Sequence, residues 1–347
     1  MNRDLDLEQR YRRALRVLPG YYRERWEEDM VAAFLDSWMS GDPEDDAWIL
    51  EFGRPTRPEV ASVAGLAARL YLGGAGAPRR YFAWGQAVRG AVLTVVLVHA
   101  VFSLGTFVRL GWDDRVFGVP APPLSLAAAP VGIWLTATVA VAAAWIVVFA
   151  ALLLGQYRAA KVIAALTIVT DLAVLLQRQL TGPLPLPYGA WAYWILLDLA
   201  PVLAMAAFHR DAPPAARRPW LVALPAIYLL VALPAMAIQA TGNAEWLPDF
   251  SGLCCVLVAL ACVLHAPRAW SRHSAGSGVW SLTLALLAAV ATAYRIISLG
   301  DYLNDPHLMH VSLAELLILA AGAALIAPDA ARTQAATPAP PPRPQLG

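Results

Sequence analysis

Long, continuously apolar segments dominate this chain after residue 80 and limit the folds open to it. A helix that crosses the hydrocarbon core of a bilayer needs about 20 mostly apolar residues. The sequence contains eight such segments, whose apolar residues run on without the alternation that is typical of membrane-barrel strands. We therefore predict membrane-spanning helices at residues 88–110, 130–155, 162–181, 188–208, 220–240, 250–266, 278–299 and 310–327, of which 250–266 is the shortest.

The composition agrees with this prediction. Of the 347 residues, 59% are hydrophobic and 15% are charged, whereas soluble domains have about 45–50% apolar and about 25% charged residues. The formal net charge of +1 gives no strong field that would attract a nucleic acid, so we expect no nucleic-acid partner. The expected fold is all-α, and the lipid bilayer is its main surroundings.

The charges between the apolar segments predict the orientation. One set of loops is basic and the other is mainly acidic, and the positive-inside rule assigns the basic side to the cytoplasm. Both termini are then expected in the cytoplasm of a multi-pass protein of the plasma membrane. The basic set comprises Arg158, Lys161, Arg210, Arg217, Arg218, Arg268 and Arg272, and the opposite set comprises Asp113, Asp114, Arg115, Glu245, Asp249, Asp301 and Asp305.

The front end of the chain has a different character. Residues 1–80 carry 12 Arg and 14 Asp or Glu, and apolar residues recur there at helical spacing in three or four short stretches. Thr56 and Glu59 have the spacing of a capping box at the start of the last stretch. We expect a small cytoplasmic helical prefix domain at residues 1–80, a transmembrane bundle at 84–328, and a disordered Pro-rich cytoplasmic tail at 329–347.

One face of the second prefix helix carries a stripe of large side chains. Tyr22, Trp26, Met30 and Phe34 recur every four residues and so share a helix face. The stripe has two readings: it belongs to the small core of the prefix domain, or it docks a partner. We expect the tryptophans of this domain, Trp26, Trp38 and Trp48, to supply much of the core.

The prefix also resembles a known type of module. The residues that carry the resemblance are Arg10–Pro19, Tyr22–Met30, Phe34–Asp36, Arg57–Glu59 and Ala67–Leu70. This pattern of aromatic, Arg and Glu positions resembles the helical prefix (HAAS-type, permease-prefix) domain of actinobacterial multi-pass membrane proteins that often accompany PadR-type transcription regulators. The resemblance implies that the prefix contacts a cytoplasmic regulator or a membrane partner, and it transfers no catalytic residue.

Ionisable side chains inside the apolar segments are the strongest candidates for a site, because burying charge in a bilayer is costly. Asp171, Asp198, Arg295 and Glu315 lie within these segments, and His99 lies in the middle of the first. One interpretation is a polar cavity that holds these groups and binds a small cation or polar solute. The other is a set of internal salt bridges, Asp171 or Asp198 with Arg295, that fixes helix packing.

No motif of this sequence specifies a reaction. The P-loop, dinucleotide, zinc-protease and nucleophile-elbow patterns do not occur, and the spacing of His307, His310 and Glu315 does not favour a metal site. We expect no cofactor, no metal and no enzymatic activity. The leading hypothesis is a non-enzymatic signalling or regulatory protein, and the alternative is a secondary transporter or permease-like protein with a polar intramembrane site.

Overall fold

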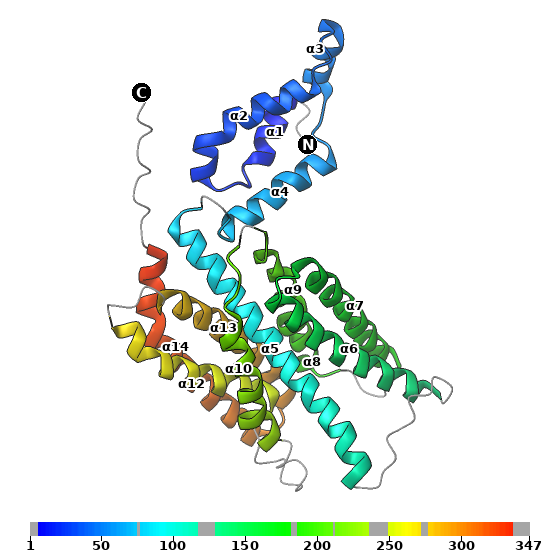
Figure 1. Cartoon of the computed structure of the whole chain (residues 1–347), viewed down its shortest axis with the longest axis vertical. Coiled ribbons are helices and arrows are strands. Elements are labelled where there is room, and N and C mark those ends of the chain that lie inside the picture. The colour runs from blue at the N-terminus through cyan, green and yellow to red at the C-terminus, as the bar shows by residue number, and fades with distance from the viewer. Residues whose placement is uncertain are drawn as a thin grey trace.

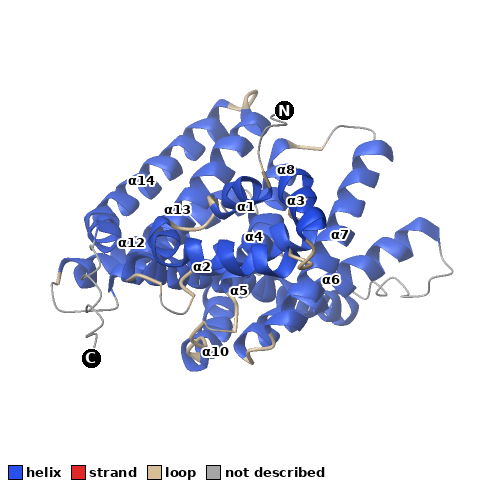
Figure 2. Ribbon diagram, turned by 90° about the horizontal axis from the view of Figure 1, so that it is seen from above, coloured by secondary structure: helices blue, strands red, loops and turns tan. Residues whose placement is uncertain are grey.

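The computed structural model describes residues 6–74, 77–116, 129–181, 186–210, 212–235, 249–271 and 277–335. Every regular element within these ranges is a helix, which confirms the predicted all-α class (Figure 1). A group of short helices lies at one end of a bundle of longer ones, and seen from that end it lies across the middle of the bundle (Figure 2). We call this end of the bundle the prefix end and the opposite end the far end.

Three of the four prefix helices begin at a residue whose side chain caps the helix. Asp6 and Asp42 accept backbone N–H bonds at the starts of their helices, and Thr56 and Glu59 form the predicted capping box. Glu59 also accepts a bond from Trp38 Nε1 at 3.0 Å. Burial alone would raise the pKa of Glu59, but the bonds from Thr56 and Trp38 hold it below its ordinary value. The prefix helices are α1 (Leu7–Leu15), α2 (Gly20–Trp38), α3 (Pro43–Phe52) and α4 (Arg57–Tyr71).

The prefix helices enclose a hydrophobic core of their own. Leu7 and Leu15 are fully buried, and the rings of Tyr11 and Phe34 stack at 3.8 Å between centroids. The other members are Leu18, Val31, Val63, Ala67 and Leu70, all from the same helices and the turn between α1 and α2. The core belongs to α1, α2 and α4, while α3 contributes no buried residue.

A close contact joins the prefix to the membrane helices. Gly73 has a φ of +80°, which favours glycine and turns the chain from α4 into the next helix. Gly85 lies so close to the backbone carbonyl of Leu72 that a Cβ there would overlap it. The ring of Tyr81 packs against Tyr21 at 5.4 Å and Tyr71 at 5.7 Å. The prefix domain thus packs directly against the first membrane helix.

In its described residues, each predicted membrane segment coincides with a helix or a continuous run of helical turns; residues 236–240, the end of the predicted segment 220–240, lie outside the described residues. Within the described residues, seven regions are long and apolar enough to cross a membrane, and a shorter apolar helix at Val139–Leu153 lies in the second predicted segment. The chain is thus a multi-pass membrane protein. Its membrane elements are α5 (Arg79–Val116), α6 (Ala129–Leu153), α7 (Tyr157–Thr181), α8 (Tyr188–Tyr193), η1 (Trp194–Leu199), α9 (Ala200–Ala204), η2 (Met205–Ala207), α10 (Arg217–Ile227), η3 (Tyr228–Ala232), α12 (Phe250–Trp270), α13 (Ser277–Ser298), η5 (Leu299–Tyr302) and α14 (Pro306–Ala335).

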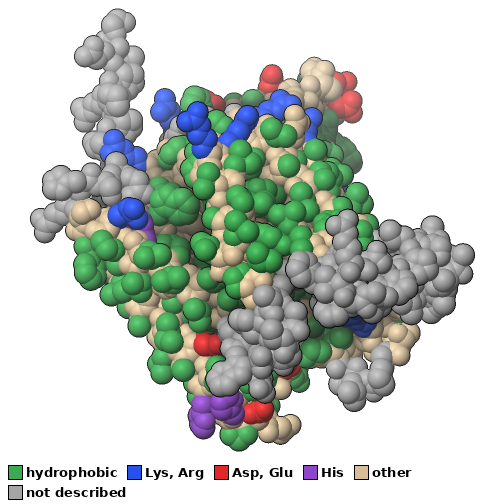
Figure 3. Space-filling model, turned by 60° about the horizontal axis from the view of Figure 1, so that its bottom comes forward, with side chains coloured by type: hydrophobic (Ala, Val, Ile, Leu, Met, Phe, Trp, Pro, Cys, Tyr) green, Lys and Arg blue, Asp and Glu red, His purple; other side chains and the backbone are tan. Residues whose placement is uncertain are grey.

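Helix α5 is the central element of the bundle (Figure 1). It packs against α6 on one side and α13 on the other, while α12, α13 and α14 pack tightly against one another. Hydrophobic side chains cover most of the face seen in Figure 3, with Lys and Arg along its upper border and His side chains at its lower end. This distribution is the one expected of a protein surrounded by lipid.

Two boundaries differ from the prediction. Helix α5 begins at Arg79, before the expected bundle start at residue 84. Helix α14 continues through Pro328 to Ala335, so residues 329–335 are helical and do not belong to a disordered tail. Ser281 Oγ donates to Asp329 Oδ2 at 2.8 Å and ties this last turn to α13. Residues 336–347, the rest of the predicted tail, lie outside the described residues.

Candidate functional site

The stripe on α2 is largely part of the prefix core. Phe34 is buried against Tyr11, and Met30 and Tyr22 pack against the same cluster. Only Trp26 points outward, with 41% of its surface exposed. Phe34 is therefore a core residue and Tyr22 and Met30 are partly buried against the core, which leaves Trp26 as the most exposed member of the stripe.

The exposed aromatic surface of the prefix lies instead on α3. Trp48 is 64% exposed and Phe52 is 55% exposed, and their ring centroids lie 5.9 Å apart. The prediction that Trp26 and Trp48 supply the core is wrong, since of the three tryptophans only Trp38 packs against it. We call Trp48 and Phe52 the α3 aromatic pair. Its i, i+4 spacing was visible in the sequence, but nothing there showed that the core could close without it.

The structure does not bring the four predicted intramembrane residues into one site. Arg295 and Glu315 form an ion pair with each other, from α13 and α14. Asp198 instead lies beside His99, with 3.3 Å between Oδ1 and Nε2. Asp171, on α7, is half-buried and close enough to Asp198 for their charges to interact. The expected salt bridge from Arg295 to Asp171 or Asp198 is absent from the described residues, where Arg295 pairs with other carboxylates.

Arg295 is the centre of a polar network at the far end of α12, α13 and α14. Its Nη1 donates to both oxygens of Asp249, at 2.7 and 2.8 Å, and to Ser251 Oγ at 2.5 Å. Tyr302 donates its hydroxyl to Asp249 Oδ2 at 2.5 Å. Asp249 also caps α12 by accepting from the Gly252 N–H at 2.8 Å. One guanidinium thus holds two carboxylates and joins three helices.

Glycine allows the approach of Glu315 to this network. A Cβ at Gly252 would overlap the Glu315 carboxylate, so only glycine leaves room for the carboxylate there. Asp249 was expected in an outer loop, and its position immediately before Phe250 is the N-cap pattern that marks its role. The network therefore fixes helix packing, which matches the salt-bridge interpretation with a different partner for Arg295.

His99 occupies a second polar site, where the fourth membrane segment departs from regular α-helix. Residues Trp194–Leu199 form a π-turn, and Pro201 follows it. In an α-helix the Leu197 carbonyl would bond to the N–H of residue 201, which proline lacks. His99 Nε2 donates to this carbonyl at 2.9 Å. His99 of helix α5 thus supplies the hydrogen-bond donor that Pro201 lacks.

The rest of the His99 ring is also engaged. The ring stacks on Trp145 at 4.2 Å between centroids and 9° between planes, and Tyr193 Oη lies 3.3 Å from Nδ1. Asp198 is buried, and its Oδ1 lacks a hydrogen bond among the described residues. π-Turns recur at functional sites. Asp198, a buried carboxylate in such a turn, is the polar group of this bundle that helix packing explains least.

Replacing His99 tests how far the site depends on this donor. We expect His99→Leu to destabilise the bundle by about 1–3 kcal/mol, because the buried Leu197 carbonyl would lose its donor. His99→Gln keeps an amide donor and should cost less. Denaturant titration of both variants in detergent would measure the difference, and equal losses would contradict the assigned bond.

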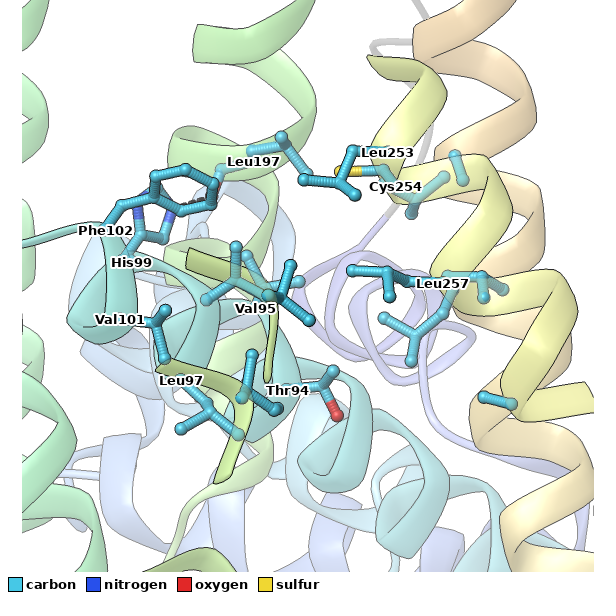
Figure 4. A pocket seen from close by; sticks show the side chains of 18 of the residues that line it. Thr94, Val95, Leu97, His99, Val101, Phe102, Leu197, Leu253, Cys254 and Leu257 are labelled. Carbon is cyan, nitrogen blue, oxygen red and sulfur yellow. Dashed lines mark hydrogen bonds between the residues drawn. The ribbon is translucent and has the colours of Figure 1, made fainter. Parts of the chain in front are cut away.

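An aromatic layer separates the two polar sites and closes one end of a cavity. Tyr193, Phe250 and Tyr294 meet with centroid distances of 5.5–6.3 Å, and Phe102 joins Phe250 at 4.9 Å. Behind the layer lies a cavity of about 390 Å³ between α5, α10, η3, α12 and α13. Figure 4 shows His99 and Phe102 at one end of it and mainly aliphatic side chains along its walls. Asp171, Asp198, Arg295 and Glu315 do not line this cavity.

Comparison with known protein families, with curated proteins and with solved structures finds no match to this chain. Within the described residues, no group of three or more His, Cys, Asp or Glu side chains has the geometry to hold a metal ion. The function must therefore be argued from the geometry of the prefix, the polar sites and the cavity.

Proposed function

We propose that this chain is a non-enzymatic membrane signalling or regulatory protein whose prefix domain docks a cytoplasmic partner through the α3 aromatic pair. The observation that carries the proposal is the exposure of Trp48 and Phe52 on a helix that buries none of its residues. Exposed aromatic pairs are costly in water and are typical anchors of protein interfaces. The prefix otherwise closes its own core, so this surface is not needed for folding.

The charges around the pair indicate the kind of partner. Glu44, Asp45 and Asp46 form the first turn of α3, and Glu51 follows Trp48. A matching surface would offer an apolar pocket with a basic rim. A PadR-type regulator is the class of partner that the resemblance of the prefix implies.

The proposed orientation places the prefix in the cytoplasm. The basic residues Arg158, Lys161, Arg217 and Arg268 lie at the prefix end of their helices, whereas Asp249, Asp301 and Asp305 lie at the far end. This segregation supports the positive-inside orientation with a cytoplasmic prefix and a C-terminus on the same side.

Affinity capture from native membranes tests the docking proposal. The full chain should retain a cytoplasmic protein that is depleted about tenfold in a Trp48→Ser, Phe52→Ser variant, because truncating aromatic anchors typically costs over about 1 kcal/mol each. Val17→Ser is the matched control, since Val17 is 54% exposed elsewhere in the prefix. Equal capture by the wild type and the double variant would contradict the proposal.

A secondary transporter is the second candidate, and the observation that favours it is the buried Asp198 beside the π-turn and Pro201. Interrupted helices with a nearby carboxylate hold substrates or coupling ions in transporters. Solute flux that needs Asp198 or Asp171 and survives loss of residues 1–80 would favour transport over docking.

A further inference from the structure

The cavity of the bundle is long and narrow. Its lining on α13 runs from Trp280 to Tyr294, which corresponds to about 21 Å along a helix. The cavity volume is about 390 Å³. A space of this length and volume admits an extended hydrocarbon chain.

The walls of the cavity are almost entirely apolar. None of the described residues that line it is Asp, Glu, Lys or Arg. Two of its polar side chains are already engaged: Thr94 Oγ1 donates to the Gly90 carbonyl at 2.9 Å, and both ring nitrogens of His99 have partners. A polar solute would find few partners along these mainly apolar walls, whereas a hydrocarbon chain needs none.

One wall of the cavity is formed by helix α10. Helix α10 buries none of its residues, contains Pro225, and passes into the π-turn η3. Its outward side chains Leu221 and Val222 face away from the bundle and are largely exposed. Proline and a π-turn are the usual causes of a bend in a helix, and a bend in α10 would open the cavity toward the bilayer.

The prefix end of the cavity carries positive charge. The cavity-lining residues of α10 and η3 form one stripe, Trp220, Ala223, Ile227 and Val231, and Arg217 continues it by one turn at the helix start. Arg217 and Arg218 are both exposed there. Trp220 and Trp280 lie 6.3 Å apart between ring centroids, at the level expected for a membrane interface.

We propose that this cavity binds one acyl chain of an anionic phospholipid, with the phosphate of the lipid beside Arg217 and Arg218 and the chain running between α10 and α13 toward Phe102 and Phe250. Arginine at the outer edge, tryptophan at the mouth and an apolar channel behind it match, in that order, the headgroup, glycerol region and acyl chain of such a lipid. The site is independent of the docking surface on α3.

Photoreactive lipid reports where the chain lies. The full-length protein is reconstituted in phosphatidylcholine vesicles that contain a minor share of phosphatidylglycerol with a diazirine in one acyl chain. After illumination, we expect adducts on the cavity-facing residues of α5, α12 and α13. Adducts confined to outward-facing residues such as Val222 would overturn the proposal.

Neighbouring residues of α10 provide a matched pair of variants. Ala223 lines the cavity, whereas Val222 is 67% exposed on the outer face. Ala223→Phe should reduce the cavity adducts about tenfold, while Val222→Phe should leave them unchanged. Ala261→Phe fills the same cavity from α12 and replaces Ala223→Phe if that variant does not fold. Equal adduct yields in the filled and control variants would contradict the proposal.

The arginines and the ligand class are tested in the same vesicles. Arg217→Gln with Arg218→Gln should remove the preference for photoreactive phosphatidylglycerol over photoreactive phosphatidylcholine without moving the adduct positions. Extracts of the protein from native membranes should contain an anionic phospholipid in stoichiometric amount. An isoprenoid quinone in its place, or an unchanged preference in the double variant, would overturn the assignment.

Discussion

Arg295→Met will destabilise the transmembrane bundle by about 3–5 kcal/mol, because it leaves two carboxylates without their cation. Asp249 and Glu315 both pair with Arg295, whose side chain is only 3% exposed. The loss should appear as a shift in the midpoint of denaturant unfolding in detergent. Arg178→Met is the control, because Arg178 is exposed on α7.

A multiple variant separates the network from simple loss of packing. Combining Arg295→Met with Glu315→Gln and Asp249→Asn removes the unpaired charges, so the triple variant should recover part of the stability lost in Arg295→Met. When two residues of one network are substituted together, the loss of stability usually differs from the sum of the single losses by about 0.5–3 kcal/mol. A triple variant less stable than Arg295→Met, or an Arg295→Met variant as stable as Arg178→Met, would contradict the assigned network.

Leu15→Ala will unfold the prefix domain while leaving the membrane helices folded. Leu15 is fully buried in a core that only three helices and one turn enclose, and Leu→Ala at such positions costs about 2–5 kcal/mol. A small domain has little stability to spare, so this loss is a large fraction of the total. Hydrogen exchange of the full chain should show loss of protection in α1, α2 and α4 and unchanged protection in α5 and α13.

The matched control for this prediction is Val17→Ala, at an exposed position two residues after Leu15 in the turn between α1 and α2. It should leave exchange in the prefix unchanged. Loss of protection that extends through α5 in Leu15→Ala would mean that prefix and bundle unfold as one unit, and would contradict the separate core described above.

The placement of the membrane helices was predictable because each needs about 20 apolar residues in a row, a signal that local sequence carries by itself. Eight were expected; within the described residues seven regions are long and apolar enough to span, and the shorter helix Val139–Leu153 lies in the second expected segment. The capping box at Thr56 and Glu59 was predictable for the same reason, since its partners are three residues apart. Helix ends that depend on tertiary contacts could not be predicted. Near the C-terminal end of α14, for example, Asp329 accepts a hydrogen bond from Ser281, which lies 48 residues away in the sequence.

The sequence could predict which residues belong to the polar sites, but not which of them pair with one another. The cost of burying charge identified Asp198, Arg295 and Glu315, but their pairing depends on which helices are neighbours. His99 and Pro201 show the limit clearly: the freed Leu197 carbonyl follows from Pro201, whereas its donor comes from α5, 98 residues away. Trp48 was misassigned because spacing shows that residues share a face, and does not show whether another helix covers it.

The most direct test of the docking proposal is photocrosslinking in living cells from a photoreactive amino acid placed at position 48 of the full-length chain. The account predicts one cytoplasmic protein crosslinked from position 48 and from position 52, and none from position 17 on the opposite part of the prefix. Adducts from position 17 alone, or adducts with proteins outside the cytoplasm, would contradict both the docking surface and the proposed orientation.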